Sequence, residues 1–193
     1  PSDDPSAPAD CLGNPNRAPY VRAEGERWVA SPTPVTPPTQ IVGTTDLSVL
    51  ARPRTSEDVL PAPLGWRGAA MLRGHELQPD DARLALRTGG LRVFVVPAGE
   101  GWVCLQVYGP PAGTGGTCNP TEALVTFGAI PLYQGAPGGR IRAIGLVGDG
   151  FDTITAPDGR SAPIVNNVFV MDTVHGAKLT LSGPAGRHRI SVF

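Results

Sequence analysis

The sequence predicts a mainly β protein with a minor helical part: an antiparallel β-sandwich or open barrel of six to seven strands, preceded by short helices. Two observations predict this class. Apolar residues in the second half of the chain recur with a period of two, and turn signals rich in Gly, Pro and Asp separate them at intervals of about 8–12 residues. Gly (25) and Pro (22) are abundant, but the clustering of the apolar residues favours a folded β-rich domain over disorder.

The N-terminal segment differs in composition from the rest of the chain. Nine of the 22 prolines fall in the first 40 residues, and residues 31–39 have the composition of a polyproline II segment or stalk. The sequence therefore predicts a Pro-rich arm or linker over residues 1–40 and a β-rich globular domain over residues 41–193. The arm is either a solvated tether or a segment that docks on a neighbouring subunit.

Short helices are expected before the strands. Thr45 and Asp46 can cap a helix over residues 47–50 that ends before Pro53, and residues 55–58 (Thr-Ser-Glu-Asp) offer a second cap. Pro79 with two following aspartates predicts a third helix through residues 82–87. Its acidic first turn and basic last turn would complement the helix dipole.

From residue 91 the pattern indicates strands. Residues 91–96 and 102–107 predict a hairpin, with Val103, Leu105 and Val107 on one face and Cys104 on the other. Residues 124–127 and 130–133 are ambiguous. Further strands are expected at residues 141–147, 151–155, 164–170, 178–182 and 188–193, with turns at Asp158-Gly159 and at residues 183–186.

The cysteines indicate a structural disulfide. Cys104 and Cys118 flank a Gly/Pro-rich loop (residues 108–117) that is expected to close over the strand carrying Cys104. A disulfide that closes a loop of about 15 residues would stabilise the fold by roughly 3 kcal/mol. The alternative is that both cysteines are buried free thiols. A disulfide would indicate an oxidising compartment. Cys11 is then unpaired, free to link two chains or to be acylated, although no lipobox-like apolar stretch precedes it.

Composition also limits the location and the partners. The net charge of −1 excludes a generic polyanion binder, so no nucleic acid is expected as a partner. No run approaches 18 apolar residues, so no transmembrane segment is expected. The chain begins at Pro1 with no signal segment, as a processed secreted protein or a shortened chain would. The large excess of Arg over Lys is typical of a GC-rich genome. These features together predict an extracytoplasmic protein, secreted or at the cell surface.

No catalytic, cofactor or metal site is expected. Motifs of the kinds GxSxG, SxxK and HExxH are absent, and the possible start of the last at His75-Glu76 ends at Pro79. His175 and His188 are scattered along the chain. The glycine-rich run at residues 113–117 has no lysine and follows no βα unit, so it does not predict a phosphate loop.

Three further groups of residues have structural interpretations. Asp149, Asp152 and Asp158 are too few for a calcium site and predict turns. Asn166 and Asn167 are expected inside a strand, with the inward amide bonded to a loop backbone. The tryptophans are too far apart in sequence to predict a sugar-binding platform; they are Trp28, Trp66 and Trp102.

Residues 47–61, with the sequence LSVLARPRTSEDVLP, resemble the "VLRRPxTxxDxLP" segment of a family of uncharacterised actinobacterial extracytoplasmic proteins. The resemblance covers roughly residues 45–170, and it departs from the family at Gly148, where Pro is usual. It implies an extracytoplasmic location and no particular activity. Its other motifs are Val103-Cys104-Leu105, Cys118, residues 145–155 (GLVGDGFDTIT), Asp158-Gly159 and residues 165–169 (VNNVF).

The expected function is a non-enzymatic secreted or membrane-tethered module that binds a partner or a cell-envelope component. One alternative is a structural subunit of an extracellular assembly or filament, built through the N-terminal arm. A hydrolase with an unrecognised site is the second alternative. The near-neutral charge and the odd Cys11 are compatible with self-association, so a protein partner or a second copy is the expected interaction.

Overall fold

A computed structural model of the 193-residue chain describes residues 20–22, 28–30, 45–61, 77–99, 101–110, 113–135 and 139–192. The chain divides into two compact units, Pro1–Thr39 and Gln40–Phe193. In the first unit, β1 (Tyr20–Arg22) and β2 (Trp28–Ala30) pair antiparallel. The predictions made for residues 31–39, Cys11, Trp66 and His75 lie outside the described residues.

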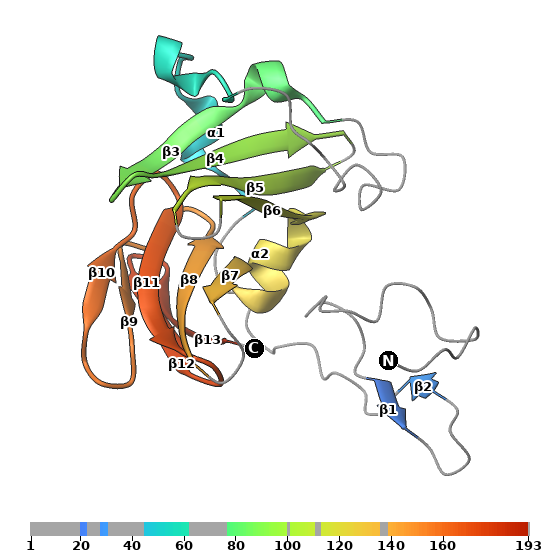
Figure 1. Cartoon of the computed structure of the whole chain (residues 1–193), viewed down its shortest axis with the longest axis vertical. Helices are drawn as coiled ribbons and strands as arrows, with labels where there is room; N and C mark the ends of the chain where they lie inside the picture. The colour runs from blue at the N-terminus through green and yellow to red at the C-terminus, as the bar shows by residue number, and fades with distance from the viewer. Residues whose placement is uncertain are drawn as a thin grey trace. The chain divides into compact units, whose positions relative to one another are not determined.

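The second unit contains three antiparallel sheets (Figure 1). The first sheet has the order β3 (Arg83–Thr88), β4 (Leu91–Ala98), β5 (Trp102–Gly109), β6 (Gly113–Pro120). The middle sheet has the order β11 (Val168–Val174), β8 (Arg140–Leu146), β7 (Ile130–Gly135). The third sheet has the order β10 (Ser161–Pro163), β9 (Thr153–Thr155), β12 (Lys178–Gly183), β13 (Gly186–Ser191). The helices are short: α1 (Ser48–Ala51), η1 (Ser56–Asp58), η3 (Pro79–Asp81) and α2 (Glu122–Phe127).

The predicted fold class is confirmed: the protein is mainly β, with sheets that are not closed into a barrel, as in a β-sandwich. The strands from β3 to β13 number eleven, more than the six to seven expected. The extra strands come from segments that the sequence assigned to a helix, to a loop or to an ambiguous class.

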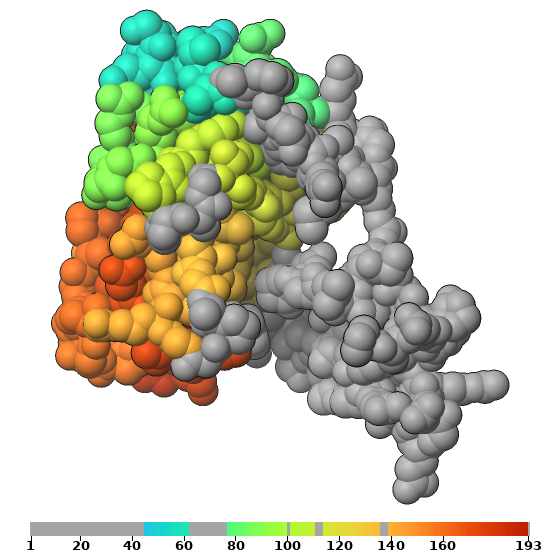
Figure 2. Space-filling model, in the orientation of Figure 1, coloured from blue at the N-terminus to red at the C-terminus, as the bar shows by residue number. Residues whose placement is uncertain are grey.

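The middle sheet is buried on both faces. One face packs against the first sheet, where Val93 and Leu105 meet Ile144 and Val168. The other face packs against the third sheet, in a core that includes Ala143, Phe169, Met171, Ile154, Leu179 and Leu181. In the space-filling view the yellow-green first sheet lies directly on the orange middle sheet (Figure 2). Burial on both faces explains the continuous apolar runs at residues 143–146 of β8 and 168–171 of β11.

The first sheet is also apolar on the face that points away from the middle sheet, which we call the outer face. It carries a buried cluster of Ala82, Leu84, Phe94, Val96, Ala98, Cys104 and Tyr108. The predicted division of the β5 side chains is confirmed, because Val103, Leu105 and Val107 belong to the core beneath and Cys104 to this outer cluster.

The predicted helix over residues 82–87 is wrong. Pro79 and the two aspartates open only the 3-10 turn η3, and the chain then continues as β3 along β4. The register shifts between Leu84 and Leu86, so Leu84 joins the outer cluster while Leu86 packs on the core beneath. Burial of Leu84, partial burial of Leu86 and pairing with β4 outweigh the local helix-start signals.

The predicted strand over residues 164–170 is also corrected. Val165 and Val168 exchange backbone hydrogen bonds of 2.9 Å around a tight turn, and β11 begins only at Val168. Asn166 and Asn167 form this turn with φ of 48° and 67°, a left-handed conformation that asparagine tolerates better than most residues. The Asp158-Gly159 turn is confirmed, but it joins β9 to β10.

Candidate functional site

The Asn167 side chain ties helix α1 to the middle sheet. Its amide nitrogen donates to the Val147 carbonyl oxygen (3.1 Å) and to Asp149 Oδ1 (2.7 Å). Its amide oxygen accepts from the backbone N–H of Val49 (3.0 Å) and from the Ser48 hydroxyl (3.2 Å). The prediction that this inward amide bonds a loop backbone is confirmed, although the residue lies in a turn.

Asp149 completes the cap of helix α1. Its Oδ1 accepts a hydrogen bond from the backbone N–H of Ser48 at 3.0 Å, although the two residues are 101 positions apart in the sequence. The predicted cap by Thr45 and Asp46 is therefore wrong. The cap position is Leu47, and the first N–H groups are satisfied by Asp149 from the loop after β8 and by Asn167 from the turn before β11. Partial burial raises the pKa of Asp149, but the hydrogen bonds from Asn167 and Ser48 outweigh it and hold the pKa below its usual range.

Replacing Asn167 with alanine is expected to lower the free energy of unfolding by about 2 kcal/mol. The variant loses the four bonds of the amide and places alanine at positive φ. Asn167→Gly keeps the turn conformation and loses only the amide, so it separates the two causes. Urea unfolding of both variants measures them, and a glycine variant as stable as the wild type would show that the amide bonds contribute nothing.

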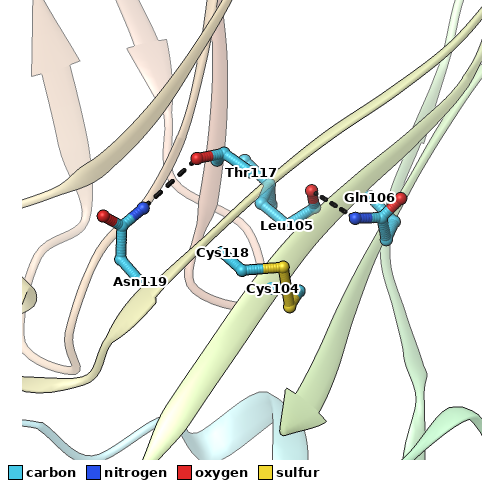
Figure 3. The surroundings of a disulfide bond; sticks show 6 residues. All are labelled: Cys104, Leu105, Gln106, Thr117, Cys118 and Asn119. Carbon is cyan, nitrogen blue, oxygen red and sulfur yellow. Dashed lines mark hydrogen bonds between the residues drawn. A yellow bond between two sulfur atoms is a disulfide. The ribbon is translucent and has the colours of Figure 1, made fainter. Parts of the chain in front are cut away.

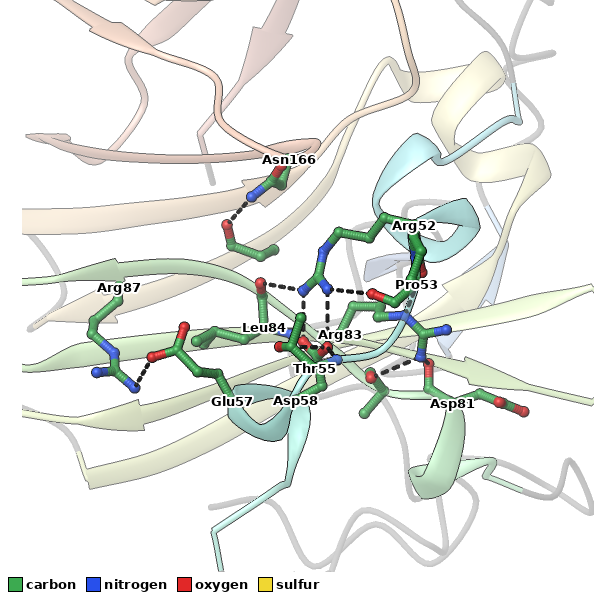
Figure 4. A network of polar contacts seen from close by, with 12 residues as sticks. Arg52, Pro53, Thr55, Glu57, Asp58, Asp81, Arg83, Leu84, Arg87 and Asn166 are labelled. Atoms are coloured by element: carbon green, nitrogen blue, oxygen red, sulfur yellow. Dashed lines mark hydrogen bonds and ion pairs between the residues drawn. The ribbon is translucent and has the colours of Figure 1, made fainter.

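A second polar cluster, shown in Figure 4, joins residues 52–58 to β3. The fully buried carboxylate of Asp58 accepts two hydrogen bonds from the Arg52 guanidinium, at 2.6 and 2.9 Å. It also accepts the backbone N–H groups of Thr55 (2.6 Å) and Leu84 (2.7 Å). The predicted cap at Thr55 is confirmed, because Thr55 and Asp58 form a reciprocal capping box around η1.

These hydrogen bonds keep the Asp58 carboxylate ionised and fully occupied as an acceptor. The hydrogen bonds from Arg52, assisted by those from Thr55 and Leu84, hold the pKa of Asp58 well below its usual range against the opposing effect of burial. A carboxylate with all its acceptor positions occupied serves as a structural anchor and is poorly suited to act as a general base.

The predicted disulfide is present between Cys104 and Cys118 (Figure 3). The expected geometry is corrected, because residues 113–117 lie in β6, paired with β5 in continuous register, and do not form a flexible loop. The two cysteines are direct cross-strand partners with Cα atoms 4.0 Å apart. The bond therefore fixes β6 to its neighbour on the outer face.

Two polar side chains accompany the disulfide on the outer face. The buried Gln106 amide donates to the Leu105 carbonyl oxygen at 3.1 Å, and it occupies the space that a side chain at Gly116 would need. Tyr108 packs edge to face against Phe94 with ring centroids 5.6 Å apart. Its buried hydroxyl has no hydrogen-bond partner in the described part of the chain, and burial raises its pKa.

A small pocket opens at one end of the core between the first and middle sheets. It has a volume of about 140 Å³, and it is lined by Thr88, Gly89, Arg142, Val170 and Asp172. This volume is below the roughly 300 Å³ of typical small-molecule sites. The pocket is large enough for one side chain or a few water molecules.

The pocket's charged pair follows from strand register. Asp172 lies directly opposite Arg142 across the β11–β8 ladder, with Nε and Oδ1 2.9 Å apart. The hydrogen bond from Arg142, with the charges of Arg140 and Arg160 nearby, holds the pKa of Asp172 below its usual range. Sequence reasoning missed this pair because nothing local links two residues 30 positions apart.

Replacing Asp172 with asparagine is expected to change the free energy of unfolding by less than about 1 kcal/mol, because both partners are partly exposed to water. The measurement is thermal unfolding at low and at high salt. A loss above 2 kcal/mol, or one unaffected by salt, would show that the pair is not an ordinary surface ion pair.

The other candidate residues are not assembled into a reactive group. His175 is exposed in the turn after β11, and the His188 ring lies 3.3 Å from the Phe127 carbonyl oxygen. Asp158 accepts from Arg160 at 2.8 Å, as expected of turn chemistry. Asp152 is exposed, and its backbone bonds to Ser182 and Ile164.

Within the described ranges, no three His, Cys, Asp or Glu side chains are grouped as metal ligands would be. The helices in the same ranges are all too short or too polar to cross a membrane. Comparisons of the chain with protein-family models, with curated proteins and with solved structures find no match.

Proposed function

We propose that the chain is a non-enzymatic module, secreted or membrane-tethered, that binds a protein partner or a cell-envelope component outside the cytoplasm. The observation that carries the location is the Cys104–Cys118 disulfide, since such bonds persist in oxidising compartments. Membership of the actinobacterial extracytoplasmic family is part of the same proposal.

The roles of the motif residues support a non-enzymatic module. Arg52, Thr55 and Asp58 come from the first motif of the resemblance, and they tie the N-terminal segment of the domain to β3. Asp149 and Asn167 come from its later motifs, and they hold helix α1. The polar residues of the motifs therefore stabilise the fold, which supports a scaffold that presents a surface.

The location is tested by blocking free thiols in intact source cells before lysis, then mapping Cys104 and Cys118 by mass spectrometry. The proposal expects both cysteines in one disulfide-linked peptide pair from the envelope or culture fraction. Recovery of both as blocked thiols from the cytoplasmic fraction would contradict it.

Binding is tested by sedimenting the purified full chain with an envelope fraction from the source cells, before and after that fraction is treated with protease. Retention by the treated fraction identifies a wall component, and retention lost on treatment identifies a protein partner. A chain that stays in the supernatant in both cases contradicts the proposal. Release of soluble wall fragments would favour the hydrolase alternative.

The alternative of a structural subunit is favoured by a different observation, which is the open edge of the first sheet at β6.

A further inference from the structure

Strand β6 forms one edge of the first sheet and has an unusual composition for an edge. It contains glycines, threonines, Cys118 and Asn119, with Pro120 only at its end, and no charged residue. It pairs with β5 over eight consecutive residues without a bulge. Natural edge strands are usually protected from pairing by charges, prolines, bulges or short length.

Other edge strands of this domain carry those protections. β3, at the opposite edge of the first sheet, has a register shift and the charged side chains of Arg83 and Arg87. β13 carries Arg187 and Arg189, and β10 has three residues and ends in Pro163. At the edges of the middle sheet, β7 contains Pro131 and β11 contains the charged Asp172. Among the edge strands from β3 to β13, β6 therefore has the fewest of these protections.

The hydrogen-bond pattern shows which backbone groups of β6 face outward. The Thr121 N–H donates to the Gly101 carbonyl oxygen at 2.8 Å, so the pairs of the same parity, such as Leu105 with Thr117, exchange bonds across the ladder. The pairs between them, which include Cys104 with Cys118, exchange no backbone hydrogen bonds. The Cα separation of the two cysteines is short, as is typical of non-hydrogen-bonded antiparallel pairs. The N–H and C=O groups that face away from β5 therefore belong to Thr114, Gly116 and Cys118.

These groups are accessible and held in place. Thr114 and Gly116 are exposed, and within the described residues their outward backbone groups form no hydrogen bond. The disulfide at Cys118 fixes β6 to β5, so little conformational entropy is lost when another strand is added.

We propose that β6 pairs with β6 of a second copy of this chain, antiparallel about a two-fold axis at Gly116. Thr114 then lies opposite Cys118 of the other copy, and the two Gly116 residues lie opposite each other. The outward N–H and C=O groups of Thr114, Gly116 and Cys118 then find partners, and the first sheets of both copies join into one continuous sheet. An antiparallel strand pairs with itself in this way because a two-fold interface is self-complementary.

Charge considerations favour a second copy as the occupant. Neither strand carries a charge, and the chain's net charge of −1 opposes association only weakly. This inference does not depend on the proposed binding function, which a monomeric chain could still perform.

Light scattering of the full chain over a dilution series tests the pairing. We expect particles of twice the 20.0 kDa chain mass at high concentration, and hydrogen exchange that is slowed in the dimer at the amides of Thr114, Gly116 and Cys118. Thr114→Pro removes an outward N–H without breaking the β5–β6 ladder. It is expected to raise the dimer dissociation constant at least tenfold.

Matched lysine variants keep the test independent of proline's effect on folding. Thr114→Lys places a charge at the edge and should weaken the dimer, whereas Thr126→Lys makes the same change on the exposed side of α2 and should not. The proposal is overturned if the chain is monomeric at all concentrations. It is equally overturned if the three amides exchange rapidly in the dimer, or if folded Thr114 variants dimerise like the wild type.

Discussion

Replacing Asp58 with alanine is expected to lower the free energy of unfolding by about 3–5 kcal/mol, the range found when one partner of a buried ion pair is removed. The Asp58 carboxylate is inaccessible to solvent and accepts hydrogen bonds from Arg52, Thr55 and Leu84. Its loss leaves the backbone N–H of Leu84 without its acceptor and releases the capping box of η1. Urea unfolding followed by circular dichroism gives the measurement.

The matched control is the neighbouring Glu57. This residue is exposed and lies 3.4 Å from an exposed Arg87, so Glu57→Ala should stay within about 0.5 kcal/mol of the wild type. Equal losses for the two alanine variants would show that burial and the hydrogen bonds of Asp58 do not stabilise the domain.

The pH dependence of stability provides a check on the same carboxylate. The folded-state pKa of Asp58 lies below its unfolded value, so its stabilisation is present above about pH 4 and declines as the pH falls below it. Other aspartates with lowered pKa values contribute to the acid sensitivity of the wild type. The difference between wild type and Asp58→Ala should therefore shrink as the pH falls, and a difference that stays constant down to pH 2 would contradict the assignment.

Removing the disulfide with the double substitution Cys104→Ala and Cys118→Ala is expected to lower the free energy of unfolding by about 3 kcal/mol. The two residues are 14 positions apart, so the bond mainly restricts the unfolded chain, while the β5–β6 ladder remains in the folded state. For a domain of this size the melting temperature should fall by about 6–12 °C.

A reducing agent supplies the control for this prediction. It should lower the melting temperature of the wild type towards that of the double variant, and it should leave the double variant unchanged. A wild type that melts at the same temperature with and without the bond, verified by mass spectrometry of the thiols, would show that the disulfide does not stabilise the domain.

Features that depend on a few neighbouring residues could be predicted from the sequence. The hairpins β4–β5 and β12–β13 follow from alternating apolar residues around glycine-containing turns. The cap at Thr55 follows from a carboxylate three residues later, whose partner atoms lie in the same turn. The pairing of Cys104 with Cys118 was predicted from their positions on either side of a Gly/Pro-rich segment, although residues 113–117 of that segment lie in β6 and not in a loop.

The polar clusters around Asn167 and around Arg142 could not be predicted from the sequence, because the contacts of their residues are with residues far away in the chain. Asp149 and Asn167 looked like turn and strand residues, and only the chain's return path brings them to the start of α1. The pair Arg142–Asp172 exists because β8 and β11 align in one particular register.

The sequence by itself determined the mainly β class, the Asp158-Gly159 turn and the pairing of Cys104 with Cys118, because these features show in short-range patterning. Only the tertiary structure decided that residues 83–88 form a strand, that the middle sheet is covered on both faces, and that β6 is an edge strand of the first sheet. The physical reason is the same in each case. Burial of apolar side chains and completion of backbone hydrogen bonds depend on which strands become neighbours, and those neighbours are far apart in the chain.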